Sequence, residues 1–337
     1  MRRSLVLALM PLLAAVPAAA QPSDDPVVLV IHGGAGSIVR AQMTPERETA
    51  ARTALEAALR AGHGVLTEGR PALDAVLAAI ELMEDDPTFN AGRGAVLAAD
   101  GTARHDASVM EGATGRAGAS AGTMHVRHPI RLARAVMEHS PHVLLTGEGA
   151  EEFAMTQGLE LVPNEWFVTE RRREELERVQ RREREAQGEA GPRLEQMTGT
   201  VGAVALDQAG HLAAGTSTGG MTNKRWGRVG DSPIIGAATW ADDATCGVST
   251  TGHGEFFIRL AVAHDVHARV KYLGEPCAQA AQAVIHETLQ AAGGTGGLIA
   301  LDREGRVAMP FNTGGMYRGF ITRSGAVTVR LYPDEDE

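Results

Sequence analysis

The sequence predicts an α+β fold in which two layers of mostly antiparallel sheet are covered by helices on both sides. Strand-like runs and pairs of helix-like runs follow one another without strict alternation of single strands and single helices. Gly-containing turns join several of the strand-like runs at hairpin length. The run 199–206 is made of small and apolar residues, as a strand buried on both faces would be.

The composition indicates a folded protein that does not bind nucleic acid. The 337 residues are 44% hydrophobic, which is enough for one large domain or two smaller ones. The formal net charge is −10, and no stripe rich in Lys and Arg runs through the folded-looking parts. Nucleic-acid-binding surfaces need such a stripe, so we exclude that class of protein.

The N-terminus has the pattern of a cleavable signal peptide over residues 1–20. It contains, in order, a basic n-region, an apolar h-region and a small-residue cleavage site, namely Arg2 and Arg3, residues 5–16, and Ala18–Ala20. A membrane anchor is the alternative, but the run is too short and contains two prolines. We therefore expect an exported protein, in the periplasm of a bacterium, and we expect no membrane-spanning segment.

The first half of the mature chain predicts one strand followed by helices and short hairpins. The strand, 27–31, is expected to run into a glycine turn at 32–36. Thr44 is the expected N-cap of a helix that has Pro45 in its first position and that Gly62 ends. The remaining predictions are a helix from Pro71 with Leu73, Val76, Leu77, Ile80 and Met83 on one face, strands at 105–110 and 121–126, and helices over 129–139 and 147–157.

Residues 171–195 contain almost no apolar residue except Leu176, Val179 and Leu194. They predict either a solvated helix with ion pairs four residues apart or a disordered linker, and in both cases the segment is expected to bury little. Acids and bases alternate almost equally, which argues against a nucleic-acid-binding arm.

The second half begins with a hairpin and continues with further strands and helices. In this hairpin the strand 199–206 turns at 207–210 and returns over 211–218. The later predictions are strands at 234–240 and 245–250, helices over 255–272 and 278–291, and a last hairpin formed by 297–301 and 307–311.

Two fragments imitate a serine esterase. His32-Gly33-Gly34-Ala35 resembles the oxyanion turn of that class, and residues 215–219 match G-x-S-x-G. A nucleophile elbow needs a helix after its turn, and residues 221–227 have no helical periodicity. We therefore expect Ser217 to be an ordinary strand residue.

Other patterns suggest a metal site or a disulfide but are incomplete. His253-Gly254-Glu255 has the H-x-E spacing of zinc deaminases without the P-C-x-x-C partner. The twelve histidines are scattered, so a catalytic metal is not expected. Cys246 and Cys277 are too few for a disulfide framework, and we expect two unpaired, partly buried thiols.

A buried strand that starts with a threonine, Thr200, just after a segment that looks disordered, suggests a nucleophile made by cutting the chain. A Thr hydroxyl is a poor nucleophile, but a free α-amino group on the same residue is a base with a pKa of about 7.7–8.0. Cleavage between Gly199 and Thr200 would create both groups in one step. Gly199 has no Cβ and can take the backbone conformation that such a cut requires. Thr198 is the nearest rival, but only Thr200 stands at the head of the apolar strand.

Eight blocks taken together are more specific than any single motif. In chain order they are HGGAG, FNAGRGAVL, DASVMEG, GTVGAVALD, GTSTGGMTNK, GRVGDSPIIGAATWADD, TTGHGEFFIR and PFNTGGMYRG. On these blocks, which cover nearly the whole mature chain, the sequence resembles the isoaspartyl peptidase/plant-type asparaginase family of N-terminal-nucleophile hydrolases. The resemblance implies an αββα sandwich made as one precursor. Its α subunit would be 21–199, with a charged flexible tail at about 170–198, and its β subunit 200–337, both in one domain.

The resemblance also implies a role for individual residues. Thr200 matches the nucleophile, Thr218 the second threonine that hydrogen-bonds around it, and Thr251 with the Gly252 N–H the oxyanion hole. The residues that match substrate-binding positions are Arg228 for the α-carboxylate, Asp231 for the α-ammonium, and Gly254. His253 departs from the commonest family pattern, which has Thr there.

The implied reaction is removal of the side-chain amide of L-asparagine or cleavage of isoaspartyl dipeptides. No cofactor is required, and the resemblance adds a dimer of cleaved αβ units and a structural sodium ion on backbone carbonyls. Those carbonyls would belong to Met83, Glu84, Asp86, Phe89, Ala91 and Arg93. The alternatives are a glycosylasparaginase within the class and, outside it, the serine esterase or an exported binding protein.

Overall fold

The computed structural model describes residues 25–185 and 199–336, and within these residues two stacked sheets form the centre of the fold. The signal peptide predicted at 1–20 and the end of the charged segment lie outside the described residues. The larger sheet has the order β12-β11-β1-β5-β6-β2-β3-β4, and the smaller has the order β10-β9-β8-β7. All strand pairs are antiparallel except β3 with β4.

The larger sheet consists of β1 (Val27–Gly36), β2 (His105–Glu111), β3 (Ala117–Thr123), β4 (Leu144–Thr146), β5 (Val201–Leu206), β6 (Leu212–Thr218), β11 (Gly315–Thr322) and β12 (Val327–Arg330). The smaller sheet consists of β7 (Thr239–Ala241), β8 (Cys246–Gly252), β9 (Gly296–Asp302) and β10 (Val307–Ala308). The α-helices are α1 (Pro45–Thr67), α2 (Ala72–Asp85), α3 (Pro129–His139), α4 (Gly147–Thr156), α5 (Glu170–Glu185), α6 (Gly254–Leu260), α7 (Val262–Ala268) and α8 (Cys277–Ala283). Short 3₁₀ segments are η1 (Arg40–Gln42), η2 (Asn164–Trp166) and η5 (Pro333–Glu335), and π-helical segments are η3 (Arg269–Leu273) and η4 (Val284–Leu289).

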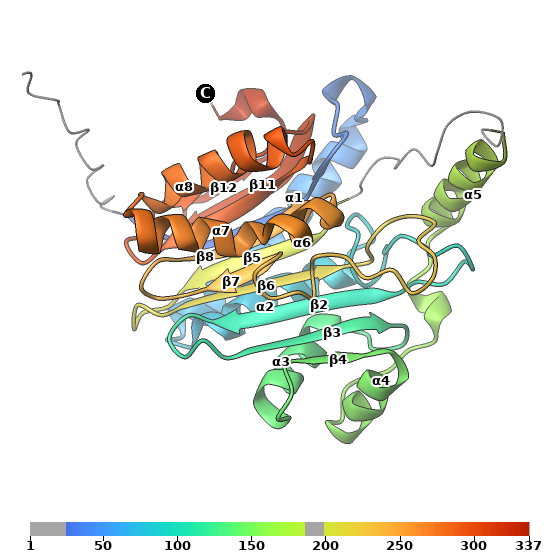
Figure 1. Cartoon of the computed structure of the whole chain (residues 1–337), viewed down its shortest axis with the longest axis horizontal. Coiled ribbons are helices and arrows are strands. Elements are labelled where there is room, and N and C mark those ends of the chain that lie inside the picture. The colour runs from blue at the N-terminus through green and yellow to red at the C-terminus, as the bar shows by residue number, and fades with distance from the viewer. Residues whose placement is uncertain (1–24, 186–198, 337) are drawn as a thin grey trace, which may run out of the picture.

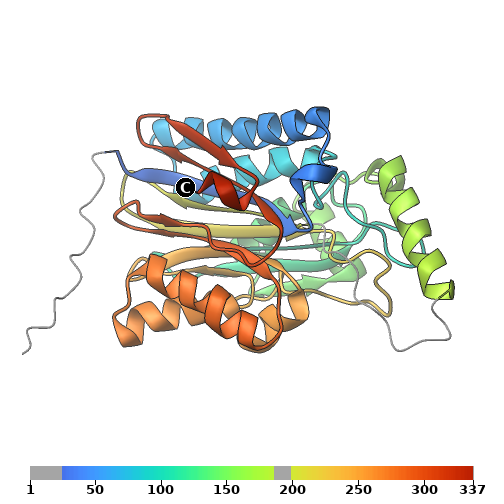
Figure 2. The same ribbon diagram turned by 90° about the horizontal axis from the view of Figure 1, so that it is seen from above.

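Helices cover the outer face of each sheet, as Figures 1 and 2 show. Apolar side chains of α1, α2 and α3 pack on one face of the larger sheet. A second cluster fills the space between the sheets, and a third lies between the smaller sheet and α7 and α8. Along β5, Val201 and Ala203 belong to the helix-side cluster and Val204 and Leu206 to the inter-sheet cluster. The predicted αββα sandwich, with a central strand buried on both faces, is confirmed.

The glycine segment 32–36 is part of β1, so the expected turn there is wrong. The strand continues to Gly36 because β11 pairs with it over its whole length, with register irregularities at two points. Gly34 has φ of +113°, which allows the strand to bulge without ending. Strands β11 and β12 were not expected from the sequence, which predicted the last hairpin only as far as residue 311.

Helix predictions were accurate where the signal was local. Thr44 caps α1 by accepting a hydrogen bond from Arg47 N, and α3 has the predicted bounds. Gly62 does not end α1, which runs on to Thr67. A Cβ atom at Gly62 would lie 2.5 Å from Leu29 Cδ2 and 2.9 Å from Ala75 O, so this glycine permits close packing of α1.

Three further bounds needed correction. The helix expected over 255–272 is interrupted at Ala261, whose φ of +49° separates α6 from α7. Of the strand expected at 234–240, only 239–240 belong to β7. The strand expected at 121–126 lies earlier, as β3 (117–123).

Helix α5 is docked on the body of the protein, although its sequence is almost entirely charged. Arg172 is 1% exposed and donates to the carbonyls of Gly94 and Phe89, while Glu175 binds both Arg172 and Thr222. Within 170–185 only Arg172 and Leu176 are buried, so the prediction of a solvated helix that buries little is confirmed there. The helix is nevertheless held by these polar contacts and by Leu176, which packs in a small apolar cluster with Phe167.

Candidate active site

Thr200 stands at the head of β5, between β1 and β6 in the middle of the larger sheet. Its side chain is nearly buried, with 8% of the residue exposed. The Thr200 hydroxyl donates to Thr218 Oγ1 at 3.0 Å, and Thr218 Oγ1 also accepts the Gly220 N–H at 3.0 Å. The structure thus brings together the two threonines that the sequence predicted, and a hydrogen bond between them orients the Thr200 hydroxyl.

The backbone at Gly199 lies directly against the bulge in β1. A Cβ atom added to Gly199 would be 1.9 Å from Gly34 Cα, and one added to Gly34 would be 2.1 Å from Gly199 Cα. Neither position has room for any side chain. The close approach to Gly34 is what demands glycine here.

His32 contacts the backbone of Thr200, the predicted nucleophile, and the sequence analysis did not predict this contact. Its Nδ1 lies 3.0 Å from the Thr200 carbonyl oxygen and its Nε2 lies 2.9 Å from Ser249 Oγ. The carbonyl can only accept, so Nδ1 carries the proton and Nε2 accepts from Ser249. Burial lowers the pKa of His32 to about 3, which keeps the ring neutral.

Behind His32, hydroxyl groups from both sheets form a buried chain. Ser249 lies 2.7 Å from Thr216 Oγ1, Thr216 lies 2.6 Å from Thr239 Oγ1, and Ser108 donates to Thr239. These residues come from β8, β6, β7 and β2, so the chain joins the two sheets beneath the nucleophile. In the sequence these residues are short polar side chains at strand positions. Hydrophobic periodicity cannot tell whether such a side chain is buried or exposed.

Thr251 and Gly252, predicted as the oxyanion hole, end β8 next to the nucleophile. Thr251 is fully buried, and its Oγ1 accepts the Ala35 N–H at 3.2 Å. Because the Thr251 oxygen is the acceptor in this bond, its own proton remains free to be donated. Both residues line the same small cavity as Thr200.

Arg228, Asp231 and Gly254 also converge at this cavity. A Cβ atom at Gly254 would lie 2.8 Å from Asp231 Oδ1 and 2.9 Å from Arg228 Nη2. The missing side chain therefore leaves open the space between a guanidinium group and a carboxylate. Burial raises the pKa of Asp231 to about 6, while Arg228 and a hydrogen bond from Thr250 act in the opposite direction.

Glu255 is a polar neighbour of this site that the sequence analysis missed. Its two carboxylate oxygens accept from Arg228 Nε and Nη2, each at 3.0 Å. Such two-pronged contact fixes the plane of the guanidinium. Arg228 Nη1 lies outside this pair and close to Gly230, where a Cβ atom would meet it at 2.9 Å. The H-x-E spacing that suggested zinc thus has a different basis, namely that Glu255 positions Arg228.

His253 lies on the far side of the same carboxylate. Its Nε2 is 3.2 Å from Glu255 Oε2, a distance suited to an ion pair, but the angle is outside hydrogen-bonding geometry. Partial burial, with Arg228 nearby, lowers the pKa of His253 and so favours the neutral ring. His253 therefore lies near Arg228 as well as beside the Glu255 carboxylate.

In the uncut chain the cavity beside Thr200 holds only about 20 Å³. It is lined by Gly199, Thr200, Thr218, Gly220, Met221, Arg228, Gly230, Asp231, Thr251 and Gly252. All seven residues predicted for catalysis and substrate binding lie on it or, in the case of Gly254, touch its walls. Gly199 fills part of the space.

Metal-binding and esterase chemistry find no support elsewhere in the described residues. No group of three or more His, Cys, Asp or Glu in residues 25–185 and 199–336 could hold a metal ion. Ser217 is buried in β6 and donates to Glu84 Oε1 at 2.6 Å, as a strand residue would. Cys246 and Cys277 are unpaired, as expected, but fully rather than partly buried.

The predicted sodium loop begins in the last turn of α2, which contains Met83 and Glu84, and main-chain hydrogen bonds together with Arg172 of α5 close it. Arg93 N donates to Glu84 O, Phe89 N to Asp86 O, and Arg172 to Phe89 O. Each of these carbonyl oxygens retains a second lone pair. The backbone carbonyls of this loop are therefore compatible with a bound structural sodium ion. The presence of that ion stays a prediction.

Two mainly antiparallel sheets between helical layers, with a threonine at the head of a central buried strand, define an N-terminal-nucleophile hydrolase. Comparison with known proteins identifies the family within this class. Residues 25–331 match the family model described as "Asparaginase". The chain belongs to this asparaginase family of hydrolases.

Individual relatives match over nearly their whole length. The chain is 49% identical over 312 residues to a protein of Escherichia coli K12 named isoaspartyl peptidase, covering 92% of this chain and 97% of that protein. A Salmonella typhimurium protein of the same name is 50% identical over 307 residues, covering 90% and 98% respectively. A Homo sapiens protein named isoaspartyl peptidase/L-asparaginase is 41% identical over 281 residues, covering 83% and 88%.

Proposed function

We propose that this chain is a self-processing amidohydrolase that cleaves β-aspartyl dipeptides and the side-chain amide of L-asparagine. The names of the relatives support this substrate class. The observation that carries the proposal is the convergence of Thr200, Thr218, Thr251, Arg228 and Asp231 on one cavity. A nucleophile there faces both a cation and an anion that match the two charges of an aspartyl group.

Processing cuts the chain between Gly199 and Thr200, leaving an α subunit of 21–199 and a β subunit of 200–337 that share one αββα domain. The Thr200 hydroxyl attacks the carbonyl of Gly199, and the peptide C–N bond breaks to give an ester and a free Thr200 amine. Water then hydrolyses the ester, which restores the Thr200 hydroxyl and releases the Gly199 carboxylate. The uncut cavity of about 20 Å³ is too small for an aspartyl group. Release of Gly199 therefore both creates the base and opens the site.

In turnover, the Thr200 amine takes the proton of its own hydroxyl as Oγ1 attacks the side-chain carbonyl of the substrate. The amine then gives this proton to the departing nitrogen, and a β-aspartyl ester remains on Thr200. Thr251 donates its free proton to the oxyanion, together with the Gly252 N–H. Water, deprotonated by the same amine, hydrolyses the ester and releases aspartate.

Substrate selection rests on Arg228 and Asp231. The guanidinium, held in plane by Glu255, faces the substrate α-carboxylate, and the Asp231 carboxylate faces the α-ammonium. An α-linked Asp-Leu has its α-carboxylate tied up in the peptide bond, which would leave Arg228 unpaired in a partly desolvated site. We expect β-Asp-Leu to have the highest kcat/KM, asparagine a lower one, and α-Asp-Leu almost none.

An assay panel on the purified protein tests this function. It contains β-Asp-Leu, α-Asp-Leu, asparagine and glycosylated asparagine, each followed by the release of aspartate. Comparable turnover of the α- and β-linked dipeptides would contradict the substrate clamp. A preference for glycosylated asparagine would favour the glycosylasparaginase alternative. If the protein released aspartate from none of the four substrates, the proposal would be refuted.

Three broader features belong to the same proposal. We propose export, on the pattern of residues 1–20, and a dimer of cleaved αβ units. No helix within the described residues is long and apolar enough to cross a membrane. No cofactor is needed for the steps above, and a sodium ion, if bound, would be held by backbone carbonyls of Met83, Glu84, Asp86, Phe89, Ala91 and Arg93 and would stiffen that loop.

A further inference from the structure

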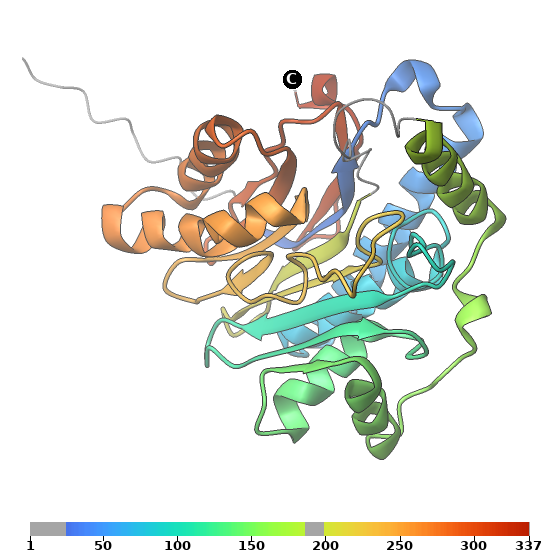
Figure 3. The ribbon, with the colours of Figure 1, turned by 45° about the vertical axis from the view of Figure 1, so that its right-hand side comes forward.

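His32 is a buried titratable side chain that takes no part in the proposed steps of processing and turnover. It is fully buried in β1, and it stands opposite Gly202 of β5, the strand that begins directly after Thr200. Figure 3 shows these two strands side by side. Burial of a polar ring is costly unless its nitrogens are paired, and both nitrogens of His32 are paired, with the Thr200 carbonyl and with Ser249.

Gly202 leaves the space in which His32 meets Ser249. A Cβ atom at residue 202 would lie 2.0 Å from Ser249 Oγ and 2.3 Å from His32 Nε2. Any side chain at this position would therefore break the contact between the two. The glycine lets the ring of His32 pass across β5 and reach Ser249 of β8 in the smaller sheet.

The protons along the buried hydroxyl chain point toward Thr200. The Thr200 carbonyl can only accept, so the neutral ring of His32 donates from Nδ1 and accepts at Nε2. Ser249 then donates its single proton to His32 and accepts from Thr216. Thr216 in turn accepts from Thr239. Hydrogen bonds that run in one direction polarise one another, so the Nδ1–H bond to the Thr200 carbonyl is the end of a cooperative chain.

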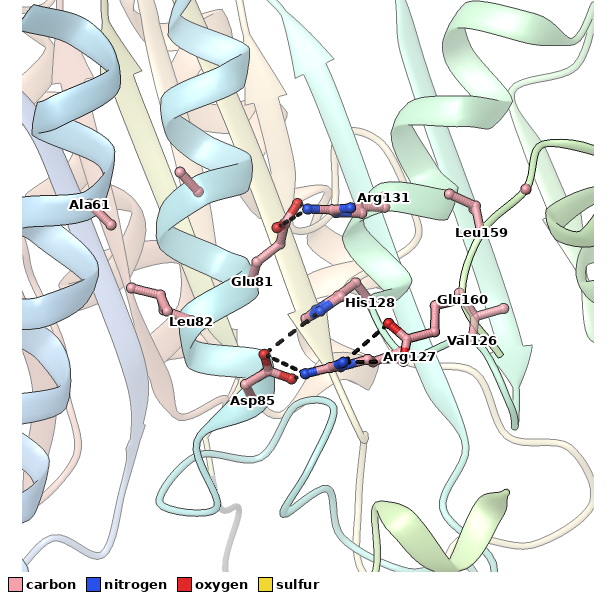
Figure 4. Close-up of a pocket in the computed structure, with 12 residues that line it drawn as sticks. Ala61, Glu81, Leu82, Asp85, Val126, Arg127, His128, Arg131, Leu159 and Glu160 are labelled. Atoms are coloured by element: carbon pink, nitrogen blue, oxygen red, sulfur yellow. Dashed lines mark hydrogen bonds and ion pairs between the residues drawn. The ribbon is translucent and has the colours of Figure 1, made fainter. Parts of the chain in front are cut away.

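A second histidine of low exposure has a different set of partners. His128 lines a cavity of about 590 Å³ between α2, α3 and the segment 158–160 (Figure 4). Its Nδ1 lies 3.3 Å from Glu84 Oε2 and its Nε2 lies 3.7 Å from Asp85 Oδ2. Two carboxylates suit a charged ring, whereas a carbonyl and a hydroxyl suit a neutral ring with one tautomer. The surroundings of His32 thus make it a donor of fixed direction rather than a charged group.

The proposed cut changes what holds Thr200 in place. In the uncut chain Thr200 is tied to Gly199, whose backbone lies directly against Gly34. After the cut Thr200 is a chain terminus, and terminal residues are poorly ordered unless they are held. Two bonds can still hold it, because its hydroxyl binds Thr218 and its carbonyl binds His32. Since the bonds at Cα are tetrahedral, fixing the side chain and the carbonyl also fixes the direction of the new amine.

We propose that His32 is a positioning residue that holds the free N-terminus of Thr200 in the cut protein. This inference rests on the proposed function and deepens it. The bond from Nδ1 keeps the amine beside its own hydroxyl, so the proton transfer between them starts from the required geometry. His32 acts through the Thr200 carbonyl and not on the substrate. Its loss should therefore lower kcat, whereas KM, which depends on Arg228 and Asp231, should stay the same.

The test uses two amide side chains that each reproduce one ring nitrogen. In His32→Asn the amide nitrogen can take the position of Nδ1 and donate to the Thr200 carbonyl. In His32→Gln the amide group reaches the position of Nε2 and can accept from Ser249, but it leaves the Thr200 carbonyl without its donor. On β-Asp-Leu, His32→Asn should retain about a third or more of the wild-type kcat and His32→Gln should lose about tenfold or more, with KM unchanged in both.

Self-cleavage provides a second readout that a purely structural role would not separate from turnover. Before the cut Gly199 still holds Thr200, so His32→Gln should slow processing, followed on a denaturing gel over time, by a smaller factor than it lowers kcat. The kcat values refer to the cut fraction of each sample. Thermal melts establish that the two variants are equally stable.

The same pair of substitutions at His267 is the matched control. His267 is 3% exposed, its Nδ1 lies 2.8 Å from Thr245 Oγ1, and it does not line the cavity of Thr200. His267→Asn and His267→Gln should have equal kcat. A difference that is confined to position 32 isolates the bond to the Thr200 carbonyl.

Several outcomes would overturn the inference. These are equal kcat of His32→Asn and His32→Gln at equal melting temperatures, a raised KM with unchanged kcat, or a loss in processing as large as the loss in turnover. If neither variant folds, Ser249→Ala decides, because it removes the partner that fixes the tautomer: kcat should fall about threefold at unchanged KM, and a wild-type kcat would overturn the inference. If wild type itself releases no aspartate from β-Asp-Leu, the proposed function falls first and this inference with it.

Discussion

Gly199 and Gly34 touch through their backbones, with so little space that a Cβ atom on Gly199 would lie 1.9 Å from Gly34 Cα. The contact presses the residue before Thr200 against the bulge of β1. In the proposed processing, the Thr200 hydroxyl attacks the carbonyl carbon of Gly199, the residue that this contact holds. On that proposal, the steric fit at this one point would couple the shape of β1 to maturation.

Gly199→Ala should strongly slow self-cleavage, because the methyl group has to displace the backbone of β1 or move the scissile carbonyl. The fraction of cut chain after purification, read from a denaturing gel over time, measures the effect. Gly314→Ala is the matched control, since its nearest atoms would lie at least 3.7 Å from the new Cβ. Normal processing of Gly199→Ala would show that the contact with Gly34 is not restrictive.

Arg228→Lys should raise KM for β-Asp-Leu at least tenfold while self-cleavage proceeds as in wild type. A lysine cannot hold Glu255 and the substrate carboxylate through one planar group, and loss of such a charge-assisted contact costs about 1.5–3 kcal/mol. The precursor has no free α-carboxylate at the cut, so processing does not need Arg228. If Arg228→Lys failed to cut itself but kept the wild-type KM for β-Asp-Leu, Arg228 would not be the residue that binds the substrate α-carboxylate.

The activity should fall in a second step at acidic pH, because Asp231 becomes protonated there. Its pKa is raised to about 6, so the carboxylate is ionised above that pH and loses its hold on the substrate ammonium as the pH falls through it. The first loss of activity, at higher pH, comes from protonation of the Thr200 amine, whose ordinary pKa is about 7.7–8.0. A plot of log kcat/KM for β-Asp-Leu should therefore steepen below pH 6, from a slope of about one to about two.

The control for this pH dependence is Asp231→Asn, which should have lower activity and no second transition. If the same steepening persisted in Asp231→Asn, another group would be responsible. The measurement is limited to pH values at which the protein stays folded, which circular dichroism checks at each point.

Lys224→Met should destabilise the protein and impair processing. Lys224 is 7% exposed and donates to the carbonyls of Arg104 and Gly219 at 2.7 Å each, next to the end of β6 that carries Thr218. Removal of the ammonium leaves two buried acceptors unpaired, at a cost of about 1–3 kcal/mol each. A thermal melt of the variant, with the exposed Lys271→Met as control, measures the effect, and equal melting temperatures would contradict it.

The same lysine makes stability depend on pH. Burial lowers the pKa of Lys224 to about 8, below the value near 10.4 expected in the unfolded chain. The folded state thus binds its proton less tightly, so this group favours folding increasingly as the pH rises from 8 towards 10.4. Lys224→Met should lack that part of the pH dependence.

Parts of this structure could be predicted because their signals are local. The N-cap at Thr44 and the bounds of α3 follow from capping chemistry and apolar periodicity within one element. The position of Thr200 at the head of β5 followed from a run of small apolar residues. The converging site residues were named through family resemblance, since no local pattern brings Arg228 next to Thr200.

What escaped prediction depends on partners far away in the chain. Arg172 and Arg318 are both buried, and each is held by backbone carbonyls and by an acid. Nothing in the nearby sequence distinguishes such arginines from exposed ones. For the same reason β11, which contains Arg318, and the docking of α5 were missed, and Glu255 was read only as part of an H-x-E spacing.

The most direct test of the account is the size and N-terminal residue of the fragments in wild type and in Thr200→Ala. Mass spectrometry of purified wild-type protein should show two chains, with the smaller one beginning at Thr200, and this material should release aspartate from β-Asp-Leu. Thr200→Ala should remain a single inactive chain, because one hydroxyl serves both processing and turnover. Two normal fragments from Thr200→Ala, or full activity of a wild-type protein that stays uncut, would contradict the assignment of Thr200 as the nucleophile.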